Sequence, residues 1–97
     1  MTNEDIIVKM KEAIGKTGGL DKSVKFDFGD DGVIHASGTE VTGNDDDADC
    51  TISVTKDDFI ALSTGNLDPM MAFMSGKLKV AGDMSVAMGL QKIFSSM

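Results

Sequence analysis

The chain has no arginine, tryptophan or tyrosine, and it has one cysteine, one histidine and one proline. Without arginine forks, a basic stripe or aromatic rings on which bases could stack, nucleic-acid binding has little support. A lone cysteine excludes an intramolecular disulfide and fits a reducing compartment. No apolar run reaches the ~20 residues of a membrane span, so the composition is that of a soluble globular protein.

Positive charge is scarce in the first half of the chain. Residues 1–49 carry 12 acidic and 5 basic side chains, whereas residues 50–97 carry 4 of each, and the net charge is −7. This balance opposes strong electrostatic docking on anionic membranes, so we expect at most transient membrane contact. The opening MTNEDIIVKMKE lacks the apolar stretch of a secretory signal, and the final Ser-Ser-Met differs from a peroxisomal Ser-Lys-Leu type address. We therefore expect a cytoplasmic protein.

A chain of 97 residues allows a single domain, residues 1–97, with one core. Apolar periodicity, capping residues and helix breakers predict helices over residues 3–15, 56–64, 70–74 and 84–95. Alternating apolar and polar residues between turn signals predict strands over residues 24–28, 33–37, 39–42, 50–55 and 78–80. Hairpin-like strands with helices segregated to parts of the chain indicate an α+β layer fold.

Two short patterns resemble catalytic or nucleotide-binding motifs without completing them. Gly15-Lys16-Thr17 looks like the end of a phosphate-binding loop, but that motif needs glycine where the chain has Met10 and a strand where it has a helix. His35 and Cys50 are a candidate base and nucleophile, yet no oriented third group is visible. A lone cysteine among Ile and Val is usually a small buried hydrophobe. We expect no catalytic residues and no cofactor.

Asp45, Asp47 and Asp49 alternate like the start of a calcium-binding loop. The EF-hand pattern then requires a glycine and, at its twelfth position, a glutamate, where this chain has Cys50 and Lys56. The carboxylates could bind a divalent ion weakly. A solvated turn that keeps the protein soluble is the preferred interpretation, and we expect no metal site.

Methionine is concentrated in the second half, where six of the eight methionines lie at or beyond Met70. Methionine has a flexible, polarizable side chain and lines surfaces that accept varied apolar shapes. Apolar residues at helical spacing are, however, also what an ordinary core contains. Periodicity alone therefore leaves both a ligand pocket and a filled core open.

A series of short motifs follows in one order between Asp49 and Phe94. It comprises Asp49-Cys50-Thr51-Ile52, Asp58, Ala61-Leu62, Thr64-Gly65, Pro69, Ala72-Phe73, Gly76-Lys77-Leu78-Lys79, Gly82, Met84, Ala87-Met88 and Leu90-Gln91. Over this stretch of nearly half its length, the chain resembles the sterol carrier protein 2 (SCP2) family of lipid-binding domains. Residues 1–48 match that family only in layout.

The resemblance implies a single mixed, largely antiparallel sheet of about five strands, covered on one face by helices. It also implies a carrier that is not an enzyme and that holds a fatty acid, fatty acyl-CoA or sterol-like ligand in an apolar tunnel between helices and sheet. Carried over by position, the ligand-binding candidates are Phe59, Met70, Met71, Phe73, Met74, Met84, Met88 and Gln91. Gln91 is the candidate contact for a polar head group.

The chain departs from this pattern in its short, acidic N-terminal half, whereas the familiar animal carriers are basic and touch membranes through the first helix. The alternative hypothesis is a protein-interaction or dimerisation module with a filled core and no small-molecule ligand, because soft Met-rich surfaces also serve promiscuous protein binding. The sequence does not identify a protein partner. The two hypotheses differ in whether a hollow remains between the C-terminal helices and the strands.

Overall fold

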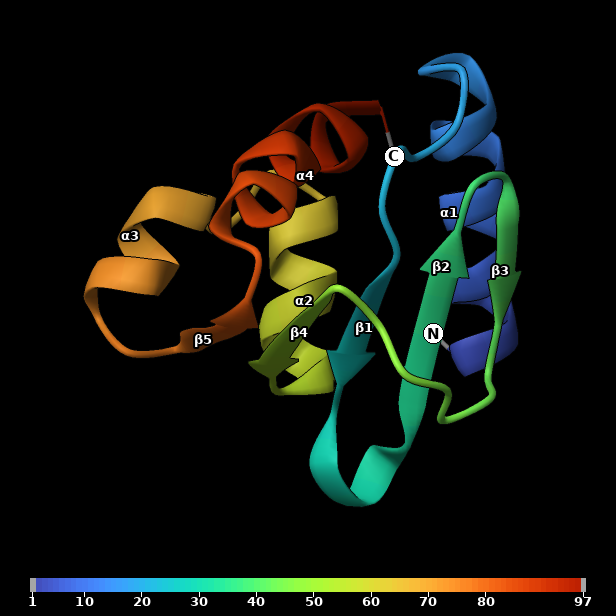
Figure 1. The fold of residues 1–97 in the computed structure, drawn as a ribbon. Coiled ribbons are helices and arrows are strands. Elements are labelled where there is room, and N and C mark those ends of the chain that lie inside the picture. The colour runs from blue at the N-terminus through green and yellow to red at the C-terminus, as the bar shows by residue number, and fades with distance from the viewer. Residues whose placement is uncertain (1, 97) are drawn as a thin grey trace.

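The computed structural model describes residues 2–96, apart from the side chains of residues 90–92, 95 and 96. Helices and strands follow one another in the predicted order (Figure 1). Their bounds are α1 (Asn3–Lys16), β1 (Val24–Asp27), the short 3-10 helix η1 (Gly29–Asp31), β2 (Val33–Ser37), β3 (Glu40–Thr42), β4 (Cys50–Val54), α2 (Lys56–Ser63), α3 (Pro69–Met74), β5 (Leu78–Gly82) and α4 (Met84–Ser96). The predicted α+β class is confirmed.

Short polar side chains fix where the helices begin. The Thr2 hydroxyl accepts the backbone N–H of Asp5, whose carboxylate accepts the N–H of Thr2, which is a reciprocal capping box at the start of α1. Thr55 caps α2 by accepting an N–H three residues ahead. Asp68 caps α3, and Pro69 occupies the first turn, where its missing N–H costs no helical hydrogen bond.

The sheet has five strands in the order β3-β2-β1-β4-β5. Neighbouring strands are antiparallel except for β1 and β4, which are parallel. Phe26 on β1 stands in register with Ile34 on β2 and Ile52 on β4, and all three side chains are buried. Because side chains alternate between the two faces of a strand, the residues between them face the other side of the sheet.

All the helices lie on the apolar side of the sheet, with α1 behind β2 and β3 and α2 behind β4 (Figure 1). Four phenylalanines form the centre of the core. The ring of Phe59 on α2 lies 5.0 Å from Phe26, 5.2 Å from Phe28 and 5.5 Å from Phe94 on α4, measured between ring centroids. These contacts fix α2 and the C-terminal half of α4 against the sheet.

The first strand, β1, is one residue shorter than predicted. The strand ends at Asp27 rather than Phe28, because the Asp27 carboxylate accepts the N–H of Gly29 at 2.8 Å and turns the chain. Phe28 still points into the core, with 6% of its surface exposed. Phe28 is therefore buried as an apolar position of the alternating pattern would be, but it lies just beyond the strand.

Candidate functional site

A cavity of about 270 Å³ lies at the β5 edge of the molecule, between the sheet and the C-terminal helices. Ile52 of β4 and two residues of β5 line it on the sheet side. Residues of α3 and α4 form the remaining walls. The complete lining is Ile52, Pro69, Met70, Phe73, Leu78, Val80, Met84, Ala87, Met88 and Phe94. Every one of these side chains is hydrocarbon or thioether.

The local structure explains why these side chains converge. Leu78 and Val80 lie two residues apart on β5 and therefore point to the same, helix-covered face of the sheet. Met84, Ala87 and Met88 recur at helical spacing on α4, so they form one stripe facing the cavity. The cavity is thus bounded by a strand face and a helix stripe, and residues of α3 form its third wall.

The cavity opens to solvent between α3 and α4. Met70 and Met88 at its margin are 62% and 78% exposed, and Phe73 and Met84 are 45% and 48% exposed. Phe94, at the inner end, is only 7% exposed and also belongs to the phenylalanine core. The wall of the cavity therefore changes from rigid and buried at the inner end to flexible and exposed at the mouth.

The structure brings together four of the eight predicted ligand-binding residues around this cavity: Met70, Phe73, Met84 and Met88. Met71 and Met74 lie on α3 but outside the lining, and they are 62% and 78% exposed. Phe59 lies in the core and is fully buried, because the other core phenylalanines surround it. The side chain of Gln91 lies outside the described part of the chain.

Sequence reasoning missed the strand side of the cavity and two residues of α4. These are Ile52, Leu78, Val80, Ala87 and Phe94, together with Pro69 at the start of α3. The alternation along β5 already indicated that Leu78 and Val80 share a face. Ala87 could have been found from its position between Met84 and Met88 on the same helical stripe.

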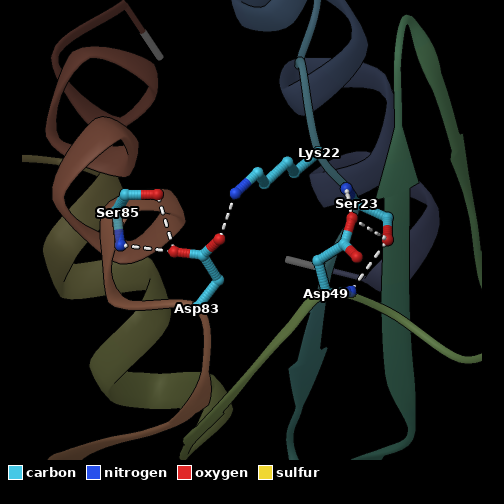
Figure 2. A network of polar contacts seen from close by, with 5 residues as sticks. All are labelled: Lys22, Ser23, Asp49, Asp83 and Ser85. Atoms are coloured by element: carbon cyan, nitrogen blue, oxygen red, sulfur yellow. Dashed lines mark hydrogen bonds and ion pairs between the residues drawn. The ribbon is translucent and has the colours of Figure 1, made fainter.

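Polar contacts hold the start of α4 in place (Figure 2). Lys22, in the segment before β1, forms an ion pair with the Asp83 carboxylate. The other oxygen of Asp83 accepts the N–H of Ser85 at 2.9 Å and its hydroxyl at 2.6 Å. The Lys22 hydrogen bond, followed by those from Ser85, lowers the pKa of Asp83 to about 2. Beside them, Asp49 accepts the N–H of Ser23 at 2.9 Å.

A second cavity, of about 320 Å³, lies on the opposite flank of α4. It is bounded by the segment after α1, including Leu20 and Lys22, and by Ser85, Val86 and Ile93 of α4. Its lining is mixed, with a lysine, an aspartate and hydroxyl groups among the apolar residues. Helix α4 therefore has unfilled space on both sides along much of its length.

His35 and Cys50 lie on opposite faces of the sheet. In register, His35 stands beside Lys25 and Lys25 beside Thr51, whereas Cys50 is beside Val24 on the apolar face. Burial is the main cause that raises the pKa of the Cys50 thiol, and His35 Nε2 lies 3.0 Å from the backbone oxygen of Asp47. The two side chains therefore cannot act together.

Among the described residues, no group of three or more His, Cys, Asp and Glu side chains is arranged to hold a metal ion. Within the same part of the chain, no helix has the length and apolarity required to cross a bilayer.

Comparison with known proteins identifies relatives of the whole fold. The profile of the SCP-2 sterol transfer family matches residues 10–95. Sterol carrier protein 2 from Homo sapiens is 44% identical over 61 residues, which make up 63% of this chain and 11% of the human protein. The matched region is thus about a tenth of the length of such curated relatives.

Two solved structures from Aedes aegypti share the fold. The solution structure of sterol carrier protein 2 in complex with the C16 fatty acid palmitate aligns with a TM-score of 0.80 and 18% identity, over 97% of this chain and 94% of that one. The solution structure of palmitated SCP2L2 aligns with a TM-score of 0.74 and 24% identity, over 97% and 95% of the two chains.

Proposed function

Because the chain belongs to the SCP-2 sterol transfer family, we propose that residues 1–97 form one non-catalytic domain that binds and carries a lipid with a long acyl chain. A fatty acid or fatty acyl-CoA is the ligand that fits this proposal best, and a sterol-like molecule is the alternative ligand. The observation that carries the proposal is the apolar cavity at the β5 edge, with its exposed and flexible mouth.

The chemistry of the cavity wall favours a hydrocarbon ligand. Each lining side chain is apolar, so an acyl chain would lose no hydrogen bonds on entry, whereas a polar ligand would leave its groups unpaired. Burying a sixteen-carbon chain at ~0.8 kcal/mol per methylene gives on the order of 12 kcal/mol before costs. Association costs of at least ~4 kcal/mol leave a net free energy consistent with micromolar or tighter binding.

The size of the cavity requires it to adapt. Its volume of about 270 Å³ is just below the roughly 300–1,000 Å³ typical of small-molecule sites. Met70, Met84 and Met88 at the mouth have three rotatable side-chain bonds each and can swing outward to lengthen it. We infer that a long chain enlarges the cavity into the tunnel expected from the resemblance.

One of the two Aedes aegypti structures is a complex with palmitate, and the other is that of a palmitated protein. They support palmitate as the first probe for this chain, because the sheet and helix arrangement is shared over nearly the whole length of both relatives.

The test is a palmitate titration of the delipidated protein, followed by calorimetry and by native mass spectrometry. The substitution Ala87→Phe places a ring in the cavity, and we expect it to weaken palmitate binding at least tenfold, on the order of two lost methylene contacts. Ala81→Phe is the matched control, because Ala81 is exposed and stands in register with Thr51 on the other face of the sheet.

Ala81→Phe should bind palmitate as the unmodified chain does, and both variants should retain a folded circular dichroism spectrum. If the unmodified chain binds no palmitate, no acyl-CoA and no sterol, the carrier proposal fails. If Ala87→Phe and Ala81→Phe weaken binding equally, a ligand binds, but not in the cavity at the β5 edge.

A further inference from the structure

The cavity at the β5 edge has a buried aromatic side chain, Phe94, at its inner end. The Phe94 side chain is 7% exposed, whereas Met84 and Met88 on the same helix are 48% and 78% exposed at the mouth. Met84 and Phe94 are separated by about 15 Å along the axis of α4, at the helical rise per residue. Helix α4 therefore runs from the mouth of the cavity to its buried end.

Phe94 is fixed in place, unlike the methionines at the mouth. Its ring centroid lies 5.5 Å from that of Phe59, with 70° between the ring planes, and 6.2 Å from that of Phe26, with 63°. Both of these partners are fully buried. Edge-to-face pairs favour one orientation of a ring, and a close-packed core leaves the ring little free volume to move into. The cavity therefore cannot lengthen at its inner end as it can at its mouth.

The inner end of the cavity has no side chain that could bind a polar group. Its buried lining residues are Phe94 and, on the sheet side, Ile52 and Leu78, which are 1% and 7% exposed. A carboxylate placed against these three side chains would lose its hydration without gaining a hydrogen bond or a counter-charge, which is strongly unfavourable. An acyl ligand must therefore enter methyl end first and keep its head group at the mouth.

We propose that Phe94 determines which acyl ligands this domain accepts, because it stops the methyl end of the chain and so sets how many carbons fit inside. The inference rests on the proposed function and adds a basis for selectivity to it. The ligand class is an acyl chain with an unsubstituted methyl end, selected by chain length rather than by head group.

The other lining residues are less suited to stop the chain. Met70, Met84 and Met88 have flexible, exposed side chains that can move aside. Ile52 and Leu78 belong to the neighbouring strands β4 and β5 and form the wall on the sheet side. Phe94 both lines the cavity and belongs to the phenylalanine core, so it connects the ligand site to the most rigid part of the domain.

The experiment measures affinities for saturated fatty acids from octanoate to stearate, by displacement of a fluorescent acyl probe below the micelle-forming concentrations. In the unmodified chain, affinity should rise about fourfold per methylene until the cavity is filled, and about twofold or less for the exposed carbons that follow. Phe94→Leu removes about three carbons from the inner end. The chain length at which the slope changes should therefore increase by roughly two to three carbons.

Phe28→Leu is the matched control. Phe28 is 6% exposed and belongs to the same core, with its ring centroid 5.2 Å from that of Phe59, but it does not line the cavity. This variant should lose stability as Phe94→Leu does and keep the change of slope at the chain length found for the unmodified protein. If both variants shift that chain length equally, or if Phe94→Leu does not shift it, Phe94 does not set the length.

A second set of ligands tests the orientation without any substitution. Hexadecanedioic acid carries a second carboxylate where palmitate has its methyl end, so entry would bury a charge against Phe94. We expect it to bind the unmodified chain at least ~100-fold more weakly than palmitate. Methyl palmitate, which differs from palmitate in the head group alone, should bind about as well as palmitate.

Equal affinity for hexadecanedioic acid and palmitate would overturn the proposal, and so would loss of binding by methyl palmitate, which would place the head group inside the cavity. Failure of the unmodified chain to bind any of the fatty acids would instead refute the carrier function on which this inference rests.

Discussion

Two glycines, one at the end of β5 and one within α4, illustrate opposite uses of a missing side chain. Gly82 ends β5 with a φ of +100°, and a Cβ there would meet the backbone oxygen of Asp49 and lie 3.2 Å from the Cα of Cys50. Gly89 lies in the middle of α4, and a Cβ there would have nothing within 4 Å. The first glycine allows β5 to approach β4 and turn into α4, whereas the second has no packing role.

Replacing each of these glycines with alanine should therefore change stability in opposite directions. We expect Gly82→Ala to lower the free energy of unfolding by about 2–4 kcal/mol, from strain at positive φ and backbone contact. Gly89→Ala should raise it by roughly 0.5–1 kcal/mol, the helix-propensity difference. Urea denaturation of the two variants measures both values. A neutral Gly82→Ala would mean that the close approach of β5 to Asp49 is not required.

At the scale of single residues, the sequence predicted the types of residue that line the cavity. It was less successful in predicting the individual residues. Phe59 and Phe73 are both phenylalanines on short helices, yet Phe59 is fully buried and Phe73 is 45% exposed. Met70 and Met71 are adjacent, but only Met70 lines the cavity. These differences depend on the direction from which each helix approaches the sheet, and periodicity within a six-residue helix such as α3 does not determine it.

At the scale of elements, α4 is anchored at its two ends and has a cavity on either side. Lys22 and Ser85 hold Asp83 at its beginning (Figure 2), and Ile93 and Phe94 are buried at its end. Cavities of about 270 and 320 Å³ flank the helix in between. A helix fixed in this way can shift sideways without unfolding, which is what entry of a bulky ligand beneath it requires.

The Asp83 anchor makes the stability of the protein depend on pH. Its pKa is lowered from the usual 3.8 to about 2, chiefly by Lys22 and then by Ser85, so the folded state favours the ionised carboxylate. This contribution is complete above pH ~4 and is lost as the pH falls through about 2. We expect Asp83→Asn to lower the melting temperature at pH 5 and to flatten its decline between pH 4 and 2.

Lys22→Gln provides the graded comparison, because it removes the ion pair and leaves both Ser85 hydrogen bonds. The melting temperature of Lys22→Gln at pH 5 should lie between those of the unmodified chain and Asp83→Asn. The Asp5 carboxylate, whose pKa is also lowered by its hydrogen bonds to Thr2, is unchanged in all three proteins. If the melting temperatures of the unmodified chain and Asp83→Asn declined in parallel between pH 5 and 2, the pH dependence could not be assigned to Asp83.

Most elements could be predicted because their ends are set locally. Thr2, Thr55 and Asp68 each bond to backbone groups two or three residues away, and such caps can be recognised in the sequence. The parallel pairing of β1 with β4 could not be predicted from the residues alone, since it joins segments about twenty-five residues apart through side chains that would suit several partners. Only the family resemblance indicated a mixed sheet.

At the scale of the whole molecule, the core is filled between α1 and the sheet, and hollow beside α4. The buried side chains of α1, including Ile6, Met10 and Ile14, fill the space over the β3 side of the sheet. At the β5 edge, α3 and α4 leave a cavity open. The filled part accounts for stability, and the cavity at the β5 edge stays adaptable because flexible methionines, Met70, Met84 and Met88, stand at its mouth. Neither the volume nor the mouth of the cavity could be inferred from composition.

This arrangement predicts that the chain unfolds as one unit and that ligand binding stabilises all of it. The phenylalanine core joins α2, α4 and the sheet, so circular dichroism and fluorescence of a bound acyl probe should report one transition. Palmitate at a hundred times its Kd should add ~2.7 kcal/mol, which raises the melting temperature of a domain of this size by roughly 10–20 °C.

The variant Ala87→Phe supplies the control, because its filled cavity should remove the palmitate-dependent shift without lowering the ligand-free melting temperature by a comparable amount. Two separate transitions would show that the β5 edge and the α1 side fold independently. In that case α4 could not transmit ligand binding to the filled core, although it touches both α1 and β5. A single transition whose midpoint palmitate raises in the unmodified chain, but not in Ala87→Phe, identifies the cavity at the β5 edge as the palmitate-binding site.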